Sequence, residues 1–213
     1  MFTKKNILVA LLAVGSLSAL TAQTDPKAKA ILDDLSAKTK AYTTIKAEFT
    51  FTTEKKDKTK ESQEGKIFTK GNKYRLEIPG HVIYCDGKTI WDFIKASNEV
   101  QVKDAETGGD DAVNPSTIFT IYEKGFKYKF DGEDATTQTI SLFPENPDKK
   151  KYHTAKLFVD KVKKQISSVK MMMKDGTTQT YTIKSFQSNT PIADSEFTFD
   201  MKAHPGVSVE DLR

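Results

Sequence analysis

The sequence predicts a mainly β protein built on one large antiparallel sheet with helices against one face. Short segments that alternate apolar and polar residues recur from Ile45 to Phe199, as half-buried strands do. The turn dipeptides Pro79-Gly80, Asp86-Gly87 and Asp175-Gly176 separate several of them. One longer segment of helical periodicity precedes the strands. We therefore expect about ten strands, with no internal domain boundary and no repeat.

Residues 1–22 have the pattern of a cleavable export signal. Lys4 and Lys5 precede an apolar run from Ile7 to Leu20, and Ala22-Gln23 offers a small-residue cleavage point. The run is shorter than the about 20 apolar residues that a membrane span needs. No Cys comes just after it, so a lipid anchor is not indicated. These features predict a signal over 1–22 and a single exported domain over 23–213.

The exported chain should begin with an amphipathic helix. Asp25 is a good N-cap, and Pro26 suits the first helical position. Apolar residues then follow a three-and-four spacing that makes one stripe: Ala28, Ile31, Leu32, Leu35 and Tyr42. The opposite side is charged. Such a helix must lay its stripe on the sheet.

The strands are expected in this order along the chain. Ala47, Phe49 and Phe51 alternate with polar residues in the first, and 65–70 forms the next, where Ile67 and Phe68 leave the inward face ambiguous. A meander over 73–102 follows, with Tyr74, Leu76 and Ile78 on one face of its first strand. After a loop over 103–112, Asn114-Pro115-Ser116 predicts a short apolar helix that Gly125 ends. Returning strands are expected at 126–130, 138–143, 153–159, 165–173, 177–186 and 196–199.

Composition and motifs indicate a binding protein rather than an enzyme. The formal net charge of +4 is weak, and the cations are nearly all Lys, whereas nucleic-acid binders favour Arg, so no nucleic acid is expected as a partner. The three His are far apart, and we find no metal-ligand spacing, nucleophile elbow or phosphate loop, so neither a metal nor a cofactor is expected. The single Cys85 cannot form an internal disulfide and is expected to be a buried small hydrophobe.

The aromatic residues have two interpretations. Periodicity alone favours a filled core over a ligand cavity. Two features favour a cavity. A curved sheet of this size has more inner face than two short helices fill easily, and Met171, Met172 and Met173 offer adaptable side chains.

Two motifs resemble one known family. The segment Cys85-Asp86-Gly87-Lys88-Thr89-Ile90-Trp91 is similar to a hairpin of the LolA family, the periplasmic outer-membrane lipoprotein carriers. Phe197-Thr198-Phe199, followed by residues 205–211, resembles that family's closing strand and tail. Shorter similarities at 48–50 and 63–65 extend the resemblance over the exported chain.

The resemblance implies an incomplete, unclosed antiparallel β-barrel of about ten to eleven strands, with helices over a hydrophobic concave face. It implies a monomeric periplasmic carrier without catalytic residues. The carrier takes acylated lipoproteins from an inner-membrane ABC complex and delivers them to an outer-membrane acceptor. We expect the acyl-binding cavity to be lined by Phe49, Phe51, Phe68, Tyr74, Leu76, Ile78, Trp91, Phe93, Ile118, Phe119, Ile121 and Tyr128.

One departure from the family concerns the lid, the helices that cover the cavity. The family often has an Arg before Pro-Asn in its second strand, which holds the lid closed by hydrogen bonds, whereas this chain has Lys70-Gly71-Asn72. Lys70 or Arg75 is expected to replace that Arg as the lid latch. Two alternatives stay open beside the lipoprotein carrier: a LolA-like carrier of another lipid, and a sensor or scaffold that transports nothing.

Overall fold

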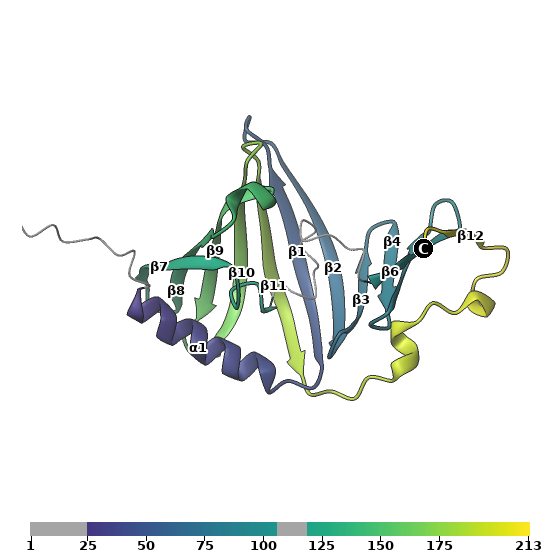
Figure 1. Ribbon diagram of the computed structural model, residues 1–213, viewed down its shortest axis with the longest axis horizontal. Coiled ribbons are helices and arrows are strands. Elements are labelled where there is room, and N and C mark those ends of the chain that lie inside the picture. The colour runs from purple at the N-terminus through teal and green to yellow at the C-terminus, as the bar shows by residue number, and fades with distance from the viewer. Residues whose placement is uncertain (1–24, 106–118) are drawn as a thin grey trace, which may run out of the picture.

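The computed structural model describes residues 25–105 and 119–213, and its strands form one open sheet (Figure 1). Twelve strands lie in the order β12-β6-β5-β4-β3-β2-β1-β11-β10-β9-β8-β7. The outer strands β12 and β7 do not pair with each other, so the predicted unclosed, mainly β architecture is confirmed. In chain order the elements are α1 (Pro26–Lys40), β1 (Ile45–Glu54), β2 (Lys60–Lys70), β3 (Lys73–Ile78), β4 (His81–Cys85), β5 (Thr89–Ile94), β6 (Glu99–Asp104), β7 (Phe126–Glu133), β8 (Thr137–Pro144), η3 (Pro147–Lys149), β9 (Tyr152–Asp160), β10 (Gln165–Met173), β11 (Thr178–Ser188), η4 (Asp194–Phe197), η5 (Met201–Ala203) and β12 (Ser208–Asp211).

Helix α1 begins where the sequence predicts and lies across the β7–β11 half of the sheet (Figure 1). The Asp25 carboxylate accepts hydrogen bonds from the backbone N–H groups of Lys27 and Ala28. It also accepts one from the N–H of Phe130 on β7, at 2.8 Å, which ties the start of the helix to the sheet. These three N–H donors hold the pKa of Asp25 below its ordinary value. The buried face of α1 is the predicted stripe of Ala28, Leu32 and Leu35.

Side-chain alternation divides the sheet into two faces. We call the face that carries α1 the concave face, and its opposite the convex face. The main core lies on the concave face and joins α1 to strands on both sides of β1. Its fully buried members include Ala47, Ile67, Ile140, Leu157 and Met171. One continuous apolar surface therefore runs from β8 through β1 to β4.

The C-terminal segment, residues 190–213, differs from expectation. The expected strand at 196–199 is instead the end of the 3-10 helix η4, followed by the extended residue Thr198 and then Phe199, neither of which is in a strand. The chain then crosses the convex face and adds β12 alongside β6, from Ser208↔Glu99 to Asp211↔Val102. That pairing is parallel, whereas the sequence predicted a wholly antiparallel sheet. A parallel neighbour is possible here because the long crossing of residues 190–207 returns the chain to the same end of the sheet.

The expected helix at 114–125 falls partly on residues 114–118, which lie outside the described residues. From Phe119 onward the chain forms a short turn rather than an α-helix. This turn is held against α1: Ser36 donates a hydrogen bond to Glu123 at 2.7 Å, and Lys40 forms an ion pair with the same carboxylate at 3.4 Å. Among the described residues, α1 is thus the one α-helix of the fold.

Gly65 is required by the packing of Phe49 across the β1–β2 pair. The Phe49 ring lies over Gly65, and a Cβ added at Gly65 would stand 2.5 Å from the ring. Because this ring is itself buried, we expect Gly65→Ala to destabilise the protein by about 1–3 kcal/mol, measured by urea unfolding. In a Phe49→Leu background the same substitution should cost markedly less. Equal costs in both backgrounds would contradict this explanation.

Candidate lipid-binding face

Five of the predicted site residues lie together on the concave face of β1 and β3. They are Phe49 and Phe51 on β1 and Tyr74, Leu76 and Ile78 on β3. Phe49, Tyr74 and Leu76 are buried, and Phe51 and Ile78 are half-buried. Burial raises the pKa of Tyr74 to about 12, as expected for a phenol in weakly polar surroundings. The sequence interpretation correctly places these five side chains on one face.

The other predicted concave residues are more dispersed. Phe119 is buried and packs edge-on against Phe186 of β11, with ring centres 5.6 Å apart. Ile121 and Tyr128 are half-buried at the edge of the same core, on the β7–β11 half of the sheet. Ile118 lies outside the described residues. These side chains pack on the α1 half, away from Leu76.

Phe68, Trp91 and Phe93 lie on the convex face, which corrects the expectation that they share the lining. Trp91 pairs with Tyr84 and Phe93 with Val82, because the Asp86-Gly87 turn sets Cys85 opposite Ile90. The C-terminal segment covers these aromatics: the Phe93 and Phe199 ring centres are 5.3 Å apart. Phe68 lies between two cations instead, with the Lys46 amino group 5.5 Å and the Arg75 guanidinium 4.7 Å from its ring centre.

Lys70 and Arg75, the possible lid latch, fasten the C-terminal segment. Lys70 and Lys73 bind the Asp194 carboxylate at 2.7 and 2.8 Å, and Lys70 also donates to the carbonyl oxygen of Ile192 at 3.2 Å. Arg75 forms ion pairs with Glu77 and Glu196. Arg75 points to the convex face because it alternates with the concave residues Tyr74 and Leu76, and Lys70 does so because it lies opposite Lys73 of the same β3 face. No described contact joins them to the turn at Phe119.

The Asp194 clamp makes a testable pH prediction. The two lysine hydrogen bonds lower the pKa of Asp194 to about 2 from its usual 3.8. A lowered carboxyl pKa stabilises the attached state above pH 3.8, and this contribution is lost as the pH falls from 3.8 to about 2. A carboxyl NMR titration should show the low pKa in the native protein. In the Lys70→Met, Lys73→Met double variant it should return toward 3.8, and an unchanged value would contradict the clamp.

Several concave residues were not identified from the sequence. Ile83 and Cys85 on β4 lie opposite Leu76 and Tyr74, and Ile90 on β5 lies opposite Cys85. The register of the β3–β4 hairpin could have identified them. Counting outward from the Pro79-Gly80 turn along both strands places Ile83 opposite Leu76. Cys85 is buried, as predicted, and burial raises the pKa of its thiol above the ordinary value. The concave surface of β3–β5 is thus mainly apolar over three neighbouring strands, and its one charged group is the His81–Asp92 pair at 2.9 Å, opposite Ile78 and Ile83.

The two halves of the concave face are filled to different extents. On the β7–β11 half, α1 and the Phe119 turn pack closely, and the cavity between Tyr42, Ile45, Ile166 and Phe186 measures only about 10 Å³. That volume holds at most one water molecule, not an alkyl chain. On the β2–β6 half no described helix lies over the concave surface (Figure 1). Among the described residues, the β2–β5 side of the concave face is thus the less covered one.

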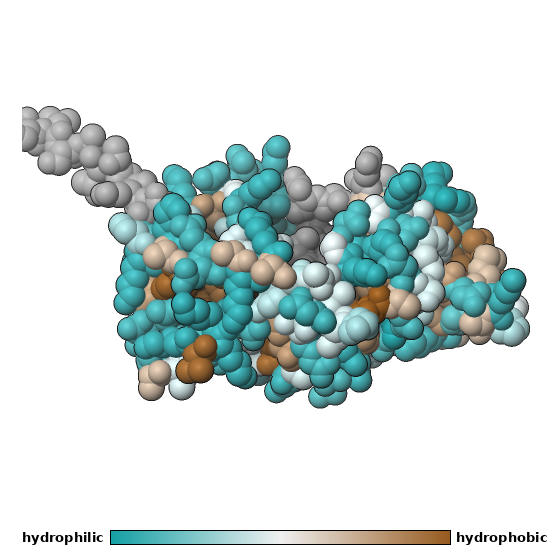
Figure 2. All heavy atoms as spheres, turned by 90° about the horizontal axis from the view of Figure 1, so that it is seen from below, coloured by the Kyte–Doolittle hydropathy of each residue, from teal (hydrophilic) through white to brown (hydrophobic). Residues whose placement is uncertain are grey.

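Neither a metal-binding cluster nor an unpartnered buried polar side chain occurs among the described residues. No group of three or more His, Cys, Asp or Glu side chains is placed to hold a metal ion within residues 25–105 and 119–213. In the same ranges every buried side-chain nitrogen and oxygen has a hydrogen-bond partner. No described helix is both long and apolar enough to cross a bilayer. Seen from below, the surface over α1 and the C-terminal segment is mostly hydrophilic, with hydrophobic residues in separate small groups (Figure 2).

Comparison with known proteins decides the family. A family model described as outer membrane lipoprotein carrier protein LolA matches residues 17–177. This chain belongs to the LolA family. The match covers α1 and the strands β1–β10 and stops before β11 and the C-terminal segment. A search of curated proteins finds no match for this LolA-family chain.

Three solved structures are similar to this chain at low identity, and the first of them, with the highest TM-score of the three, has the same fold. An uncharacterized conserved protein from Thermus thermophilus is 11% identical, with a TM-score of 0.57, over 87% of this chain and 99% of its own. The LolA superfamily protein NE2245 from Nitrosomonas europaea is 13% identical, with a TM-score of 0.46, over 82% and 98%. The Mycobacterium tuberculosis lipoprotein LppX is 13% identical, with a TM-score of 0.47, over 79% and 98%.

Proposed function

We propose that this protein is an exported periplasmic carrier that holds the acyl chains of lipoproteins and delivers them to the outer membrane. It takes its cargo from an inner-membrane ABC complex, passes it to an outer-membrane acceptor where one exists, works as a monomer and catalyses no reaction. Residues 1–22 serve as the export signal. The mature domain, from residue 23, is the carrier.

The observation that carries this proposal is the mainly apolar concave surface of β1–β5, whose charged side chains His81 and Asp92 pair with each other. Phe49, Leu76 and Cys85 lie on three different strands of it, and the described helix covers only the other half of the sheet. Phe51, Ile78 and Ile83 are half-buried along the same surface. An apolar surface that spans several strands suits an alkyl chain, whose recognition needs area rather than hydrogen bonds.

The energetics explain why such a carrier needs a large apolar surface. Each buried methylene contributes about 0.8 kcal/mol, so one acyl chain of about fifteen methylenes gains about 12 kcal/mol on leaving water. A carrier must offset most of this value and still release the chain. A receptor that binds only about 1.4 kcal/mol more tightly already biases transfer tenfold. Modest changes in how the concave face is covered therefore suffice to direct the cargo.

Native mass spectrometry of the protein purified from its own periplasm tests the proposal. We expect an adduct with the mass of a triacylated lipoprotein, lost from variants of the concave face. An adduct with the mass of a small lipid would instead identify a carrier of another lipid. The absence of any adduct, from cells that contain acylated lipoproteins, would favour a sensor or scaffold and would contradict the carrier function.

A further inference from the structure

Strand β2 has an open edge along half of its length. It pairs with β1 from Lys60 to Thr69 without a register shift. It pairs with β3 only from Lys66 to Lys70, because β3 ends at Ile78 and the chain turns back at Pro79-Gly80. Residues 60–65 thus have no strand on their β3 side within the described part of the chain. We call this opening the β2–β3 fork.

The backbone groups of the fork are directed toward the open side. The two-residue turn Gly71-Asn72 makes Lys70 and Lys73 a hydrogen-bonded pair, and every second residue of β2 then faces β3. Continued along β2, this alternation directs the N–H and C=O groups of Glu64, Ser62 and Lys60 into the fork. Residues 60–65 contain neither a Pro nor a bulge, two of the devices that block strand addition at an edge, although three of them are charged: Lys60, Glu61 and Glu64.

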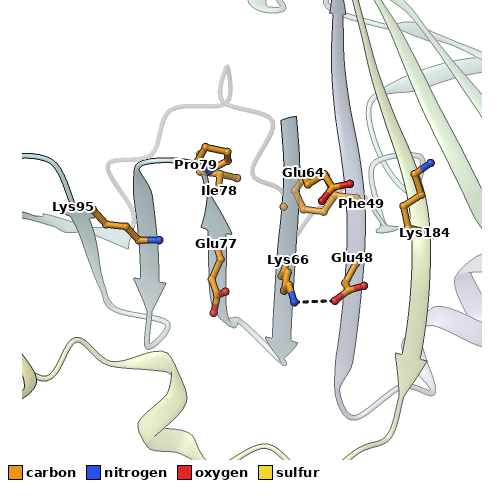
Figure 3. Close-up of a pocket in the computed structure, with 10 residues that line it drawn as sticks. Glu48, Phe49, Glu64, Lys66, Glu77, Ile78, Pro79, Lys95 and Lys184 are labelled. Atoms are coloured by element: carbon orange, nitrogen blue, oxygen red, sulfur yellow. Dashed lines mark ion pairs between the residues drawn. The ribbon is translucent and has the colours of Figure 1, made fainter. Parts of the chain in front are cut away.

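A pocket of about 510 Å³ lies at the closed end of the fork (Figure 3). Phe49, Ile78 and Pro79 supply its apolar surface, and the backbone of Gly65 lies beside the Phe49 ring. In a strand added to the fork, every second side chain would point to the concave face. One of these side chains would enter the pocket. The pocket therefore joins an unpaired backbone edge to an apolar receptacle, as strand-addition sites for peptides do.

Two lysines of the pocket are placed to bind an acidic side chain of a partner. Lys66 is paired with Glu48 at 2.9 Å, and Glu77 is paired with Arg75. Lys95, just after β5, and Lys184, on β11, line the pocket from opposite sides (Figure 3). Within residues 25–105 and 119–213 neither of these two lysines forms an ion pair. Of the acidic residues that line the pocket, Glu64 alone forms no ion pair within the same ranges. The lining as a whole is neutral, with three lysines and three glutamates, but Lys95 and Lys184 are left to meet an acidic side chain.

From this juxtaposition we propose that the β2–β3 fork is a second binding site, which takes an extended peptide segment of a partner protein by strand addition. The peptide pairs with the backbone of Lys60, Ser62 and Glu64. It places an apolar side chain against Phe49 and Ile78, and an acidic side chain between Lys95 and Lys184. This site shares Phe49 and Ile78 with the proposed acyl-binding surface of β1–β5, but its backbone edge and its two lysines are additional to that surface, and it requires no lipid.

A labelled peptide tests the backbone part of the site. The probe is a fluorescein-labelled nine-residue peptide of alternating Val and Thr with one central Asp, titrated by fluorescence polarisation. We expect saturable binding with a dissociation constant below about 1 mM. Ser62→Pro removes the N–H that faces the fork but none that pairs with β1, so it should weaken binding about tenfold or more. Ser62→Ala is the matched control, because both variants lose the hydroxyl contact with Thr52 at 2.8 Å.

The role of the two lysines is tested with a separate pair of peptides. Lys95→Met with Lys184→Met should weaken the Asp peptide but leave the same peptide with Asn at that position unchanged. The folding of each variant is checked by its thermal unfolding midpoint. Equal affinities for Ser62→Pro and Ser62→Ala, or no saturable binding, would overturn the proposal. Binding of phosphatidylglycerol vesicles that depends on the two lysines, without peptide binding, would overturn it in favour of a lipid phosphate.

Discussion

Leu76→Asp should abolish the release of lipoproteins from spheroplasts, whereas Phe68→Asp should leave most of it intact. Leu76 is 3% exposed on the concave face of β3, and a carboxylate there would meet the surface on which we place the acyl chain. Phe68 is its counterpart on the convex face of the neighbouring strand, against Arg75 and Lys46. The measurement is the amount of lipoprotein in the supernatant after each purified variant is added.

A second concave variant separates loss of binding from loss of folding. Ile83 is half-buried opposite Leu76, so Ile83→Trp fills the same surface without introducing a charge. It should lower release while preserving the far-ultraviolet circular dichroism spectrum. Full release by both Leu76→Asp and Ile83→Trp would show that this surface does not hold the acyl chain.

Phe197→Ala should have the largest effect on stability outside the concave core. Phe197 is fully buried in η4, which packs on β3 and β4 from the convex side. Removing such a ring typically costs about 3–5 kcal/mol, so we expect a loss of that size in urea unfolding. The C-terminal segment should also become sensitive to protease in this variant, since Phe197 is its most buried residue.

The exposed Met201 provides the control for this prediction. Its side chain lies in the same segment but is 55% exposed, so Met201→Ala should change the free energy of unfolding by less than about 0.5 kcal/mol. A loss below about 1 kcal/mol for Phe197→Ala would mean that η4 contributes little to holding the C-terminal segment.

Alternation and turn chemistry were enough to predict the sheet but not to assign every side chain to a face. Tyr74, Leu76 and Ile78 alternate with charged residues, so the sequence alone predicts that these three side chains share one face of the strand. Ile67 and Phe68 are adjacent, and only the pairing Ile67↔Ala47 decides that Ile67 is the inward one. Trp91 was misplaced because large aromatics were assumed to face one core. The convex face has its own small core with Phe199.

The path of the C-terminal segment could not be read from local patterns. Residues 196–199 alternate as a strand would. Tertiary contacts with residues distant in the sequence nevertheless hold this segment in the 3-10 helix η4 and the two residues that follow it. Asp194 meets Lys70 and Lys73, and Glu196 meets Arg75, across more than a hundred residues of chain. The β2–β3 fork was equally hidden, since it results from β2 being longer than β3 rather than from any motif.

Photo-crosslinking at two adjacent residues of β4 tests the central claim most directly. Ile83 faces the concave surface beside Leu76, whereas Tyr84 faces the convex surface beside Trp91. A photoreactive phenylalanine analogue placed at Ile83 should crosslink to an acylated lipoprotein in the periplasm, and the same analogue at Tyr84 should not. Crosslinking from Tyr84 alone, or equally from both positions, would contradict the assignment of the acyl chain to the concave face.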